Sequence, residues 1–309
     1  METAVNGRAP REQALAASIG TLGIWDAGIC FQPAREAQAV AIALEEAGYG
    51  AAWLHEGGHD AFAFAAILLA ATKRLTVGTS IVSIWRHEPG QMANAARTLG
   101  EAFPGRFVLG IGNSHQGASS WHGRGYARPL ADMEAYLDAM DNASWFGPRP
   151  DPPVPRMIAA LGPKMLDLAR RRTRGAIPYL VPVEHTRFAR EQLGPDPVLA
   201  VHQAVVIGFD RATARELARE HVGRYLATTN YPNNLRRLGY SEDDLANGGS
   251  DRLIHALVAI GGADEVAARV QAHLAAGADH VCVNPLTPDF PAVVPVKELE
   301  EIAKNVLGV

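Results

Sequence analysis

The chain has 309 residues, of which 48% are hydrophobic and 20% charged, and its formal net charge is −4. This composition is typical of a globular protein, and a small negative charge without a basic run argues against a nucleic-acid partner. The longest apolar run, residues 61–71, is too short to cross a bilayer, so we expect no membrane partner. Cys30 and Cys282 lie far apart, which favours a reduced, cytoplasmic location and gives no metal-ligand spacing.

Residues 1–17 lack an apolar signal core, so we expect a loose N-terminal tail before a single domain over residues 18–309. Along that domain, short apolar runs alternate with amphipathic stretches. We predict strands at residues 18–26, 50–56, 75–85, 106–112, 154–161, 175–181, 198–208 and 278–286. We predict helices at residues 34–49, 60–74, 88–103, 128–146, 162–172, 184–193, then up to about 247, and at 250–260, 263–277 and 294–308.

Eight apolar strands, each followed by helix, predict an α/β fold of the (β/α)₈ TIM-barrel type. Parallel strands that are covered on both faces should be continuous apolar runs, as these are. A doubly wound sheet is the competing fold, but it usually has fewer strands and an early glycine-rich phosphate loop. No linker or low-complexity segment divides the chain, which favours one domain.

Residues 55–59 read HEGGH, which matches the H-E-x-x-H pattern of zinc peptidases. That chemistry requires both histidines on one face of a helix. Here His55 and Glu56 end a predicted strand, and two glycines would each cost a helix about 1 kcal/mol. Asp60 follows where a helix N-cap belongs. We therefore predict a strand end and a turn rather than a zinc site, with His59 a solvated loop residue.

The carboxyl ends of barrel strands are where catalytic groups gather. Polar or aromatic residues follow several predicted strands, namely Trp25, Asp26, His55, Glu56, residues 80–86, Asn113, Ser114 and His115. The stretch GIGNSHQG only partly matches a dinucleotide-binding loop. In a barrel, Gly110 and Gly112 more simply allow a flat ligand to approach the backbone.

Two further features extend this predicted site. Gly162 and Pro163 begin a helix whose free amides at Lys164 and Met165, with the lysine charge, would attract an anion. Trp25, Trp85 and Trp121 could line an apolar substrate pocket, although packing in the core explains them equally well. The segments 113–128 and 225–250 are expected to carry the variable pocket loops.

The chain resembles the luciferase-like flavin and deazaflavin oxidoreductases, and within them the actinobacterial branch that uses coenzyme F-420. The resemblance extends from about residue 18 to 285 and rests on the order and spacing of several stretches. These are AGYGAAWLHE, ATKRLTVGTSIVSIW, FPGRFVLGIGNSH, AALGPKMLDLA, YPNNLRRLGYSEDDLANGGSDRLIHALVA and AGADHVCVN.

The resemblance implies a barrel that holds a planar redox ring over its strand ends, with a non-proline cis peptide at Ser80–Ile81. The positions that it assigns to the cofactor are Ser80, Ile81, Ser83, Asn113, Ser114, Leu161, Gly162, Pro163 and Lys164. His55 or His115 would be the acid/base, with Glu56 orienting or tuning it. Position 115 is acidic in the related sugar dehydrogenases, and its change to histidine leaves the substrate open.

The resulting hypothesis is hydride transfer between coenzyme F-420 and a small organic substrate. Two alternatives stay open: an FMN-dependent monooxygenase, and a barrel that binds a flavin or metabolite without turnover. The resemblance also implies a homodimer.

Overall fold

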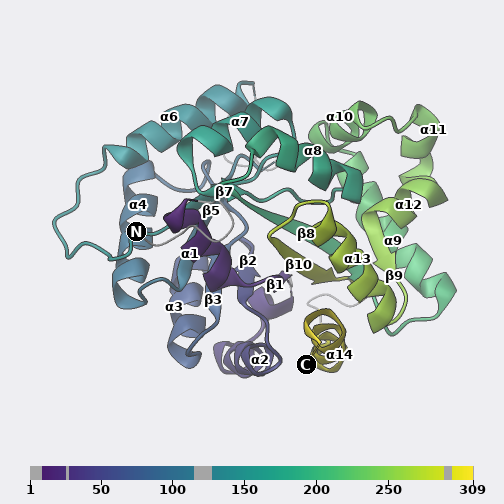
Figure 1. Ribbon diagram of the computed structural model, residues 1–309, viewed down its shortest axis with the longest axis horizontal. Coiled ribbons are helices and arrows are strands. Elements are labelled where there is room, and N and C mark those ends of the chain that lie inside the picture. The colour runs from purple at the N-terminus through teal and green to yellow at the C-terminus, as the bar shows by residue number, and fades with distance from the viewer. Residues whose placement is uncertain (1–8, 26–27, 115–126, 289–293, 309) are drawn as a thin grey trace.

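The computed structural model describes residues 9–25, 28–114, 127–288 and 294–308. Eight strands form a closed parallel ring with helices around it (Figure 1). The ring strands are β1 (Leu22–Trp25), β2 (Ala51–Leu54), β3 (Thr76–Thr79), β5 (Phe107–Gly112), β6 (Arg156–Ile158), β7 (Gly175–Ala176), β8 (Val198–Val206) and β10 (His280–Pro285). This confirms the predicted (β/α)₈ barrel, and each of the eight predicted strands contains one ring strand.

The ring closes through β10, which pairs in parallel with β1 on one side and with β8 on the other. The two-residue strand β4 (Val82–Ser83) extends the line of β3 and pairs with β5. The surrounding helices are α2 (Ala34–Glu46), α3 (Ala61–Ala71), α4 (Pro89–Ala102), α6 (Pro129–Asp141), α7 (Pro163–Arg172), α8 (Val183–Leu193), α13 (Ala263–Ala275) and α14 (Val296–Leu307). All strand pairings are parallel, so the carboxyl ends of the strands share one end of the barrel.

Local sequence signals place several helix starts. The Asp60 side chain accepts hydrogen bonds from the amides of Phe62 and Ala63, which caps α3 as predicted. Pro129 and Pro163 are the first residues of α6 and α7. The HEGGH stretch therefore spans a strand end, a turn and a cap, and its two histidines do not share a helix.

Two segments differ from the sequence prediction. Helix α1 (Pro10–Ile19) replaces most of the predicted tail and the start of the first predicted strand. Its Leu15 and Ile19 pack with Trp53 against the barrel interior, and this long-range burial has no local signal. Residues 258–260, predicted as the end of a helix, form β9 (Val258–Ile260), which pairs with the end of β8.

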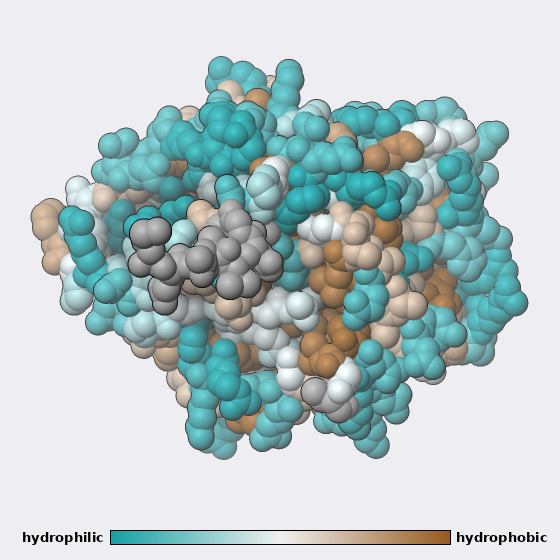
Figure 2. Space-filling model, viewed as in Figure 1, coloured by the Kyte–Doolittle hydropathy of each residue, from teal (hydrophilic) through white to brown (hydrophobic). Residues whose placement is uncertain are grey.

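Between β8 and β9 the chain inserts four helices, α9 (Arg211–Leu226), α10 (Asn230–Arg237), α11 (Glu242–Leu245) and α12 (Asp251–Leu257). They share a separate apolar cluster with Leu180 and Val258 and lie together on one side of the barrel (Figure 1). Figure 2 shows a mostly hydrophilic surface over α6 and α7, with a hydrophobic strip beside α14. The inserted helices matter for function because two of them reach the carboxyl end of the barrel.

Candidate active site

A pocket of about 470 Å³ opens at the carboxyl end of the strands. Its lining comes from strand ends, from the start of α7 and from the inserted helices. The residues that line it are Trp25, His55, Glu56, Ser80, Ile81, Ser83, Arg86, Asn113, Ser114, Pro129, Ala159, Ala160, Leu161, Gly162, Met165, Ile177, Tyr179, Tyr225, Asn230 and Tyr231. The volume lies in the range of small-molecule and cofactor sites.

The structure brings ten of the predicted site residues together in this pocket. They are Trp25, His55, Glu56, Ser80, Ile81, Ser83, Asn113, Ser114, Leu161 and Gly162. Trp85 is not among the lining residues: it packs against the hydrophobic core, and its indole N–H donates to the Asn113 carbonyl at 2.6 Å. Pro163 and Lys164 adjoin the pocket without lining it. Asp26, His115 and Trp121 fall outside the described residues.

The peptide bond between Ser80 and Ile81 is cis, which confirms the expectation drawn from the resemblance. Three hydrogen bonds hold this segment. The Ser80 amide donates to the Leu54 carbonyl at 2.6 Å, and the Trp25 indole donates to the Ser80 carbonyl at 2.7 Å. The Ser80 hydroxyl and Nε2 of His202 are hydrogen-bonded at 2.9 Å. The wall at Ser80 is therefore positioned by strands on opposite sides of the barrel.

His55 lies between two aromatic rings, with centroid distances of 5.2 Å to Trp25 and 5.5 Å to Phe31. Burial lowers the pKa of His55 to about 4, against a smaller opposing effect of the Glu56 charge. The imidazole is therefore neutral near pH 7. Its Nδ1 is buried and has no hydrogen-bond partner within the described part of the chain. Such a nitrogen in a pocket wall is suited to bonding with a ligand.

The carboxylate of Glu56 is held by residues other than His55. Its carboxylate accepts a hydrogen bond from the Ser83 amide at 3.0 Å and binds Nε2 of His87. The Arg86 guanidinium lies 3.7 Å from the same carboxylate. These three partners come from the end of β4 and the segment directly after it, and among the described residues no hydrogen bond joins Glu56 to His55. The charge of Glu56 raises the pKa of His55, so the expected tuning of His55 by Glu56 stays a prediction.

Aromatic residues that the sequence analysis did not name complete the pocket. The Tyr179 hydroxyl lies 3.2 Å from Nε2 of His221, and the hydroxyl of Tyr225 and the amide of Asn284 donate to it. Tyr179 follows β7, so the strand-end rule applied to AIPYL would have found it. Tyr225 and Tyr231 come from α9 and α10, within the segment 225–250 that was expected to reach the pocket.

The start of α7 agrees only in part with the predicted anion site. The Met165 amide donates back to the Gly162 carbonyl at 3.1 Å, so it is not free as predicted. Lys164 is exposed. A Cβ placed on Gly162 would lie 3.6 Å from Nη2 of Arg237, which brings a second cation from α10 to this turn. Two cations and a helix N-terminus therefore lie beside the pocket mouth.

A closed parallel barrel with a polar and aromatic pocket at its carboxyl end is the architecture of a (β/α)₈ enzyme. The family model described as luciferase-like monooxygenase matches residues 9–280, and the chain belongs to that family. No helix in the described residues is long and apolar enough to span a membrane. Within those same residues, no group of three histidine, cysteine or acidic side chains is placed to hold a metal ion.

Comparisons with individual proteins agree with this family. The chain is 30% identical over 167 residues to the putative coenzyme F420-dependent oxidoreductase Rv3520c of Mycobacterium tuberculosis, covering 53% of this chain and 45% of that protein. It is 30% identical over 148 residues to an F420-dependent glucose-6-phosphate dehydrogenase of Microbacterium testaceum, covering 40% and 44%. The matches thus span about half the length of these curated relatives.

Among solved structures, the coenzyme F420-dependent tetrahydromethanopterin reductase of Methanopyrus kandleri has a TM-score of 0.75 at 16% identity. An F420-dependent secondary alcohol dehydrogenase in complex with an F420-acetone adduct has a TM-score of 0.70 at 17% identity. Each comparison covers 93% of this chain and 98% of the other. At these identities the likeness establishes the fold.

Proposed function

We propose that the chain is an oxidoreductase that transfers hydride between coenzyme F-420 and a small organic substrate. The observation that carries the proposal is one continuous site, which joins the fixed wall at Ser80–Ile81 to the turn at Gly162. A ligand with a flat ring and an anionic tail suits such a site, and the names of the curated relatives point to the same cofactor.

The residues present fit this cofactor on two counts. The wall at Ser80 has its carbonyl and hydroxyl already hydrogen-bonded to Trp25 and His202, so it offers a fixed surface to a ring. At the other end, Lys164 and Arg237 lie where an anionic tail would pass the start of α7. The bound deazaflavin would supply the carbon that exchanges hydride.

The chain itself would supply the proton transfer. A neutral imidazole can accept a proton from a substrate hydroxyl, and burial keeps His55 neutral at physiological pH. Trp25, Tyr179 and Tyr231 surround the remaining space. Within the described lining, the charged side chains are Glu56 and Arg86, which lie against each other. We therefore propose an uncharged alcohol or carbonyl compound as the substrate.

Binding of the cofactor is the direct test. Titration of the apo protein with F-420, followed by fluorescence, should give a dissociation constant below about 100 μM. FMN should bind at least tenfold more weakly, because the proposed anchor favours the longer anionic tail. Absence of F-420 binding at this concentration would overturn the proposal.

The two histidines of HEGGH provide a matched pair for the proton-transfer role. Replacing His55 by alanine should lower kcat by about 100-fold or more, the usual contribution of a general base. The dissociation constant for F-420 should change less than threefold. His59→Ala is the control, because His59 is exposed, stacks on Phe64 and bonds to the Gln32 carbonyl. Steady-state rates of F-420 reduction with a panel of neutral alcohols measure both, and equal rates in the two variants would exclude His55.

An FMN-dependent monooxygenase is the second candidate, favoured by the description of the matching family model. Oxygen consumption with reduced FMN and a panel of aldehydes separates it from the first. The expectations of a homodimer and of a cytoplasmic location stay predictions, and sedimentation analysis tests the former.

A further inference from the structure

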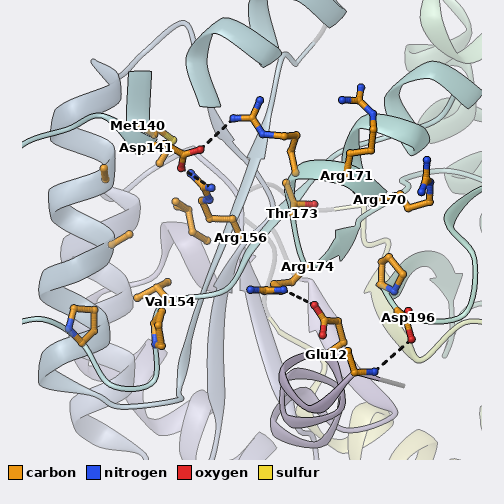
Figure 3. Close-up of a pocket in the computed structure, with 18 of the residues that line it drawn as sticks. Glu12, Met140, Asp141, Val154, Arg156, Arg170, Arg171, Thr173, Arg174 and Asp196 are labelled. Atoms are coloured by element: carbon orange, nitrogen blue, oxygen red, sulfur yellow. Dashed lines mark hydrogen bonds and ion pairs between the residues drawn. The ribbon is translucent and has the colours of Figure 1, made fainter. Parts of the chain in front are cut away.

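A second and larger cavity lies at the opposite, amino-terminal end of the barrel. Its volume is about 1,090 Å³, and it extends from the starts of β6 and β8 to α1 and the carboxyl end of α7 (Figure 3). Its distinctive feature is the number of arginines, which come from four separate parts of the chain. They are Arg97, Arg149, Arg156, Arg170, Arg171, Arg172 and Arg174.

The arginines of the lining outnumber its carboxylates, which are those of Glu12, Asp141 and Asp196. A further three carboxylates, those of Glu134, Asp138 and Asp167, bind arginines of the lining from outside it. Helix dipole effects explain only the arginines of the last turn of α7. Arg156 and Arg174 lie at the starts of β6 and β7, where no helix dipole favours a cation.

Five of the arginines have carboxylate partners. Arg156 binds Asp141 at 2.7 Å, and Arg172 bridges Asp141 and Asp138. Arg174 binds Glu12 through Nη1 at 2.5 Å. Arg170 and Arg171 bind acidic residues of α6 and α7 at the rim. A guanidinium has five N–H donors, so the arginines that keep a single carboxylate retain donors for a ligand.

Arg97 and Arg149 differ from the other five. Among the residues that the structure describes, neither has a carboxylate partner. Arg97 donates to the Asn94 side chain and the Ala143 carbonyl, and its guanidinium lies 5.9 Å from the ring centre of Trp145. Arg149 is exposed at the rim. Figure 3 shows Arg156 and Arg174 extending into the same space from the strand starts.

We propose that this cavity is a binding site for a phosphorylated anion that carries at least two negative charges. Guanidinium groups match phosphate oxygens in a bidentate geometry, and several around one space favour a polyanion over a single ion. The volume is large enough for a nucleotide-sized ligand. Trp145 and several prolines in the lining offer apolar contact for an organic group. The site is separate from the redox pocket at the other end of the barrel.

Isothermal titration calorimetry at low salt tests the proposal with three probes: inorganic pyrophosphate, ADP and adenosine. Pyrophosphate and ADP should bind with saturation, with dissociation constants of about 1 mM or lower, and adenosine should not bind. Tighter binding of ADP than of pyrophosphate identifies the nucleotide class. Equal binding identifies the phosphates as the recognised part. Raising the salt concentration should weaken both.

Two variants locate the binding. Arg149→Gln should weaken pyrophosphate and ADP at least fivefold and leave F-420 binding unchanged. Arg211→Gln is the matched control, because Arg211 is an exposed arginine at the first turn of α9, outside the cavity. Lack of saturable binding by both phosphorylated probes, or an equal loss in the two variants, would overturn the proposal.

Discussion

Acidification to about pH 5 should unfold the protein cooperatively, before most of its carboxylates are protonated. The cause is a set of buried histidines whose pKa values are lowered mainly by burial. The pKa is about 4 for His55, His185 and His280, and about 3 for His202, His221 and His273. All six are therefore neutral in the fold, whereas in the unfolded chain they titrate near 6.5.

The hydrogen bonds of these rings agree with the neutral form. The Trp53 indole, which is only a donor, bonds to Nε2 of His280, so that nitrogen accepts. Nδ1 of His280 then donates to the Gly20 carbonyl at 2.9 Å. Protonation would place a second donor against the indole N–H. The fold is thus stabilised above pH 6.5, and this stability is lost as the pH falls toward 4, because the unfolded chain binds more protons.

The expected size of the effect is large. At pH 5 each of these histidines costs the folded state on the order of 2 kcal/mol, so several together remove a large part of a typical stability of 5–15 kcal/mol. Circular dichroism and tryptophan fluorescence across pH 4–7 measure the transition, and urea unfolding at several pH values gives the number of protons bound. Replacing the exposed His255 by alanine is the control and should not move the midpoint. A fully native signal at about pH 5 would contradict the expectation.

Replacing Gly110 by alanine should destabilise the barrel by about 3 kcal/mol, at the upper end of the cost of overpacking. A Cβ at this position would lie 1.9 Å from the Thr79 carbonyl oxygen and 2.9 Å from Cδ1 of Ile177. The Thr79 hydroxyl also accepts from the Gly110 amide and donates to its carbonyl. The added methyl group would therefore push β3 away from β5, directly before Ser80.

Gly90→Ala is the matched control for this substitution. A Cβ on Gly90 meets nothing closer than Ala143 at 4.0 Å, and the residue lies in the first turn of α4. The Gly90→Ala variant should be up to about 1 kcal/mol more stable than the unaltered chain, because alanine favours helix more than glycine does. Thermal unfolding followed by differential scanning fluorimetry compares the two. Equal midpoints would show that the barrel relaxes around residue 110.

The packing around Gly110 could not be predicted from the sequence. The stretch FVLGIG suggested that Gly110 and Gly112 admit a flat ligand. In the structure, the absence of a side chain at Gly110 allows the Thr79 carbonyl of the neighbouring strand to approach. The Ile81 side chain occupies the place where a side chain of residue 112 would lie. Absence of a side chain is visible in a sequence, but the atom that approaches the backbone belongs to a distant segment.

The sequence alone determined the alternation of strands and helices, and with it the barrel and the residues at its strand ends. Periodicity, Asp60 as a cap and proline at the first position of α6 and α7 are local signals, so one stretch of chain suffices to read them. The pocket residues His55, Ser80 and Asn113 follow, because parallel strands bring their carboxyl ends together.

Only the tertiary structure decided which groups meet. Glu56 bonds to Ser83 rather than to His55, and Tyr231 enters the pocket from an inserted helix. The arginines of the cavity at the amino-terminal end of the barrel come from four parts of the chain. The burial of Ile19 and the pairing of β9 with β8 likewise depend on partners far away in sequence. These contacts are set by packing between elements, and the pattern within each element does not encode them.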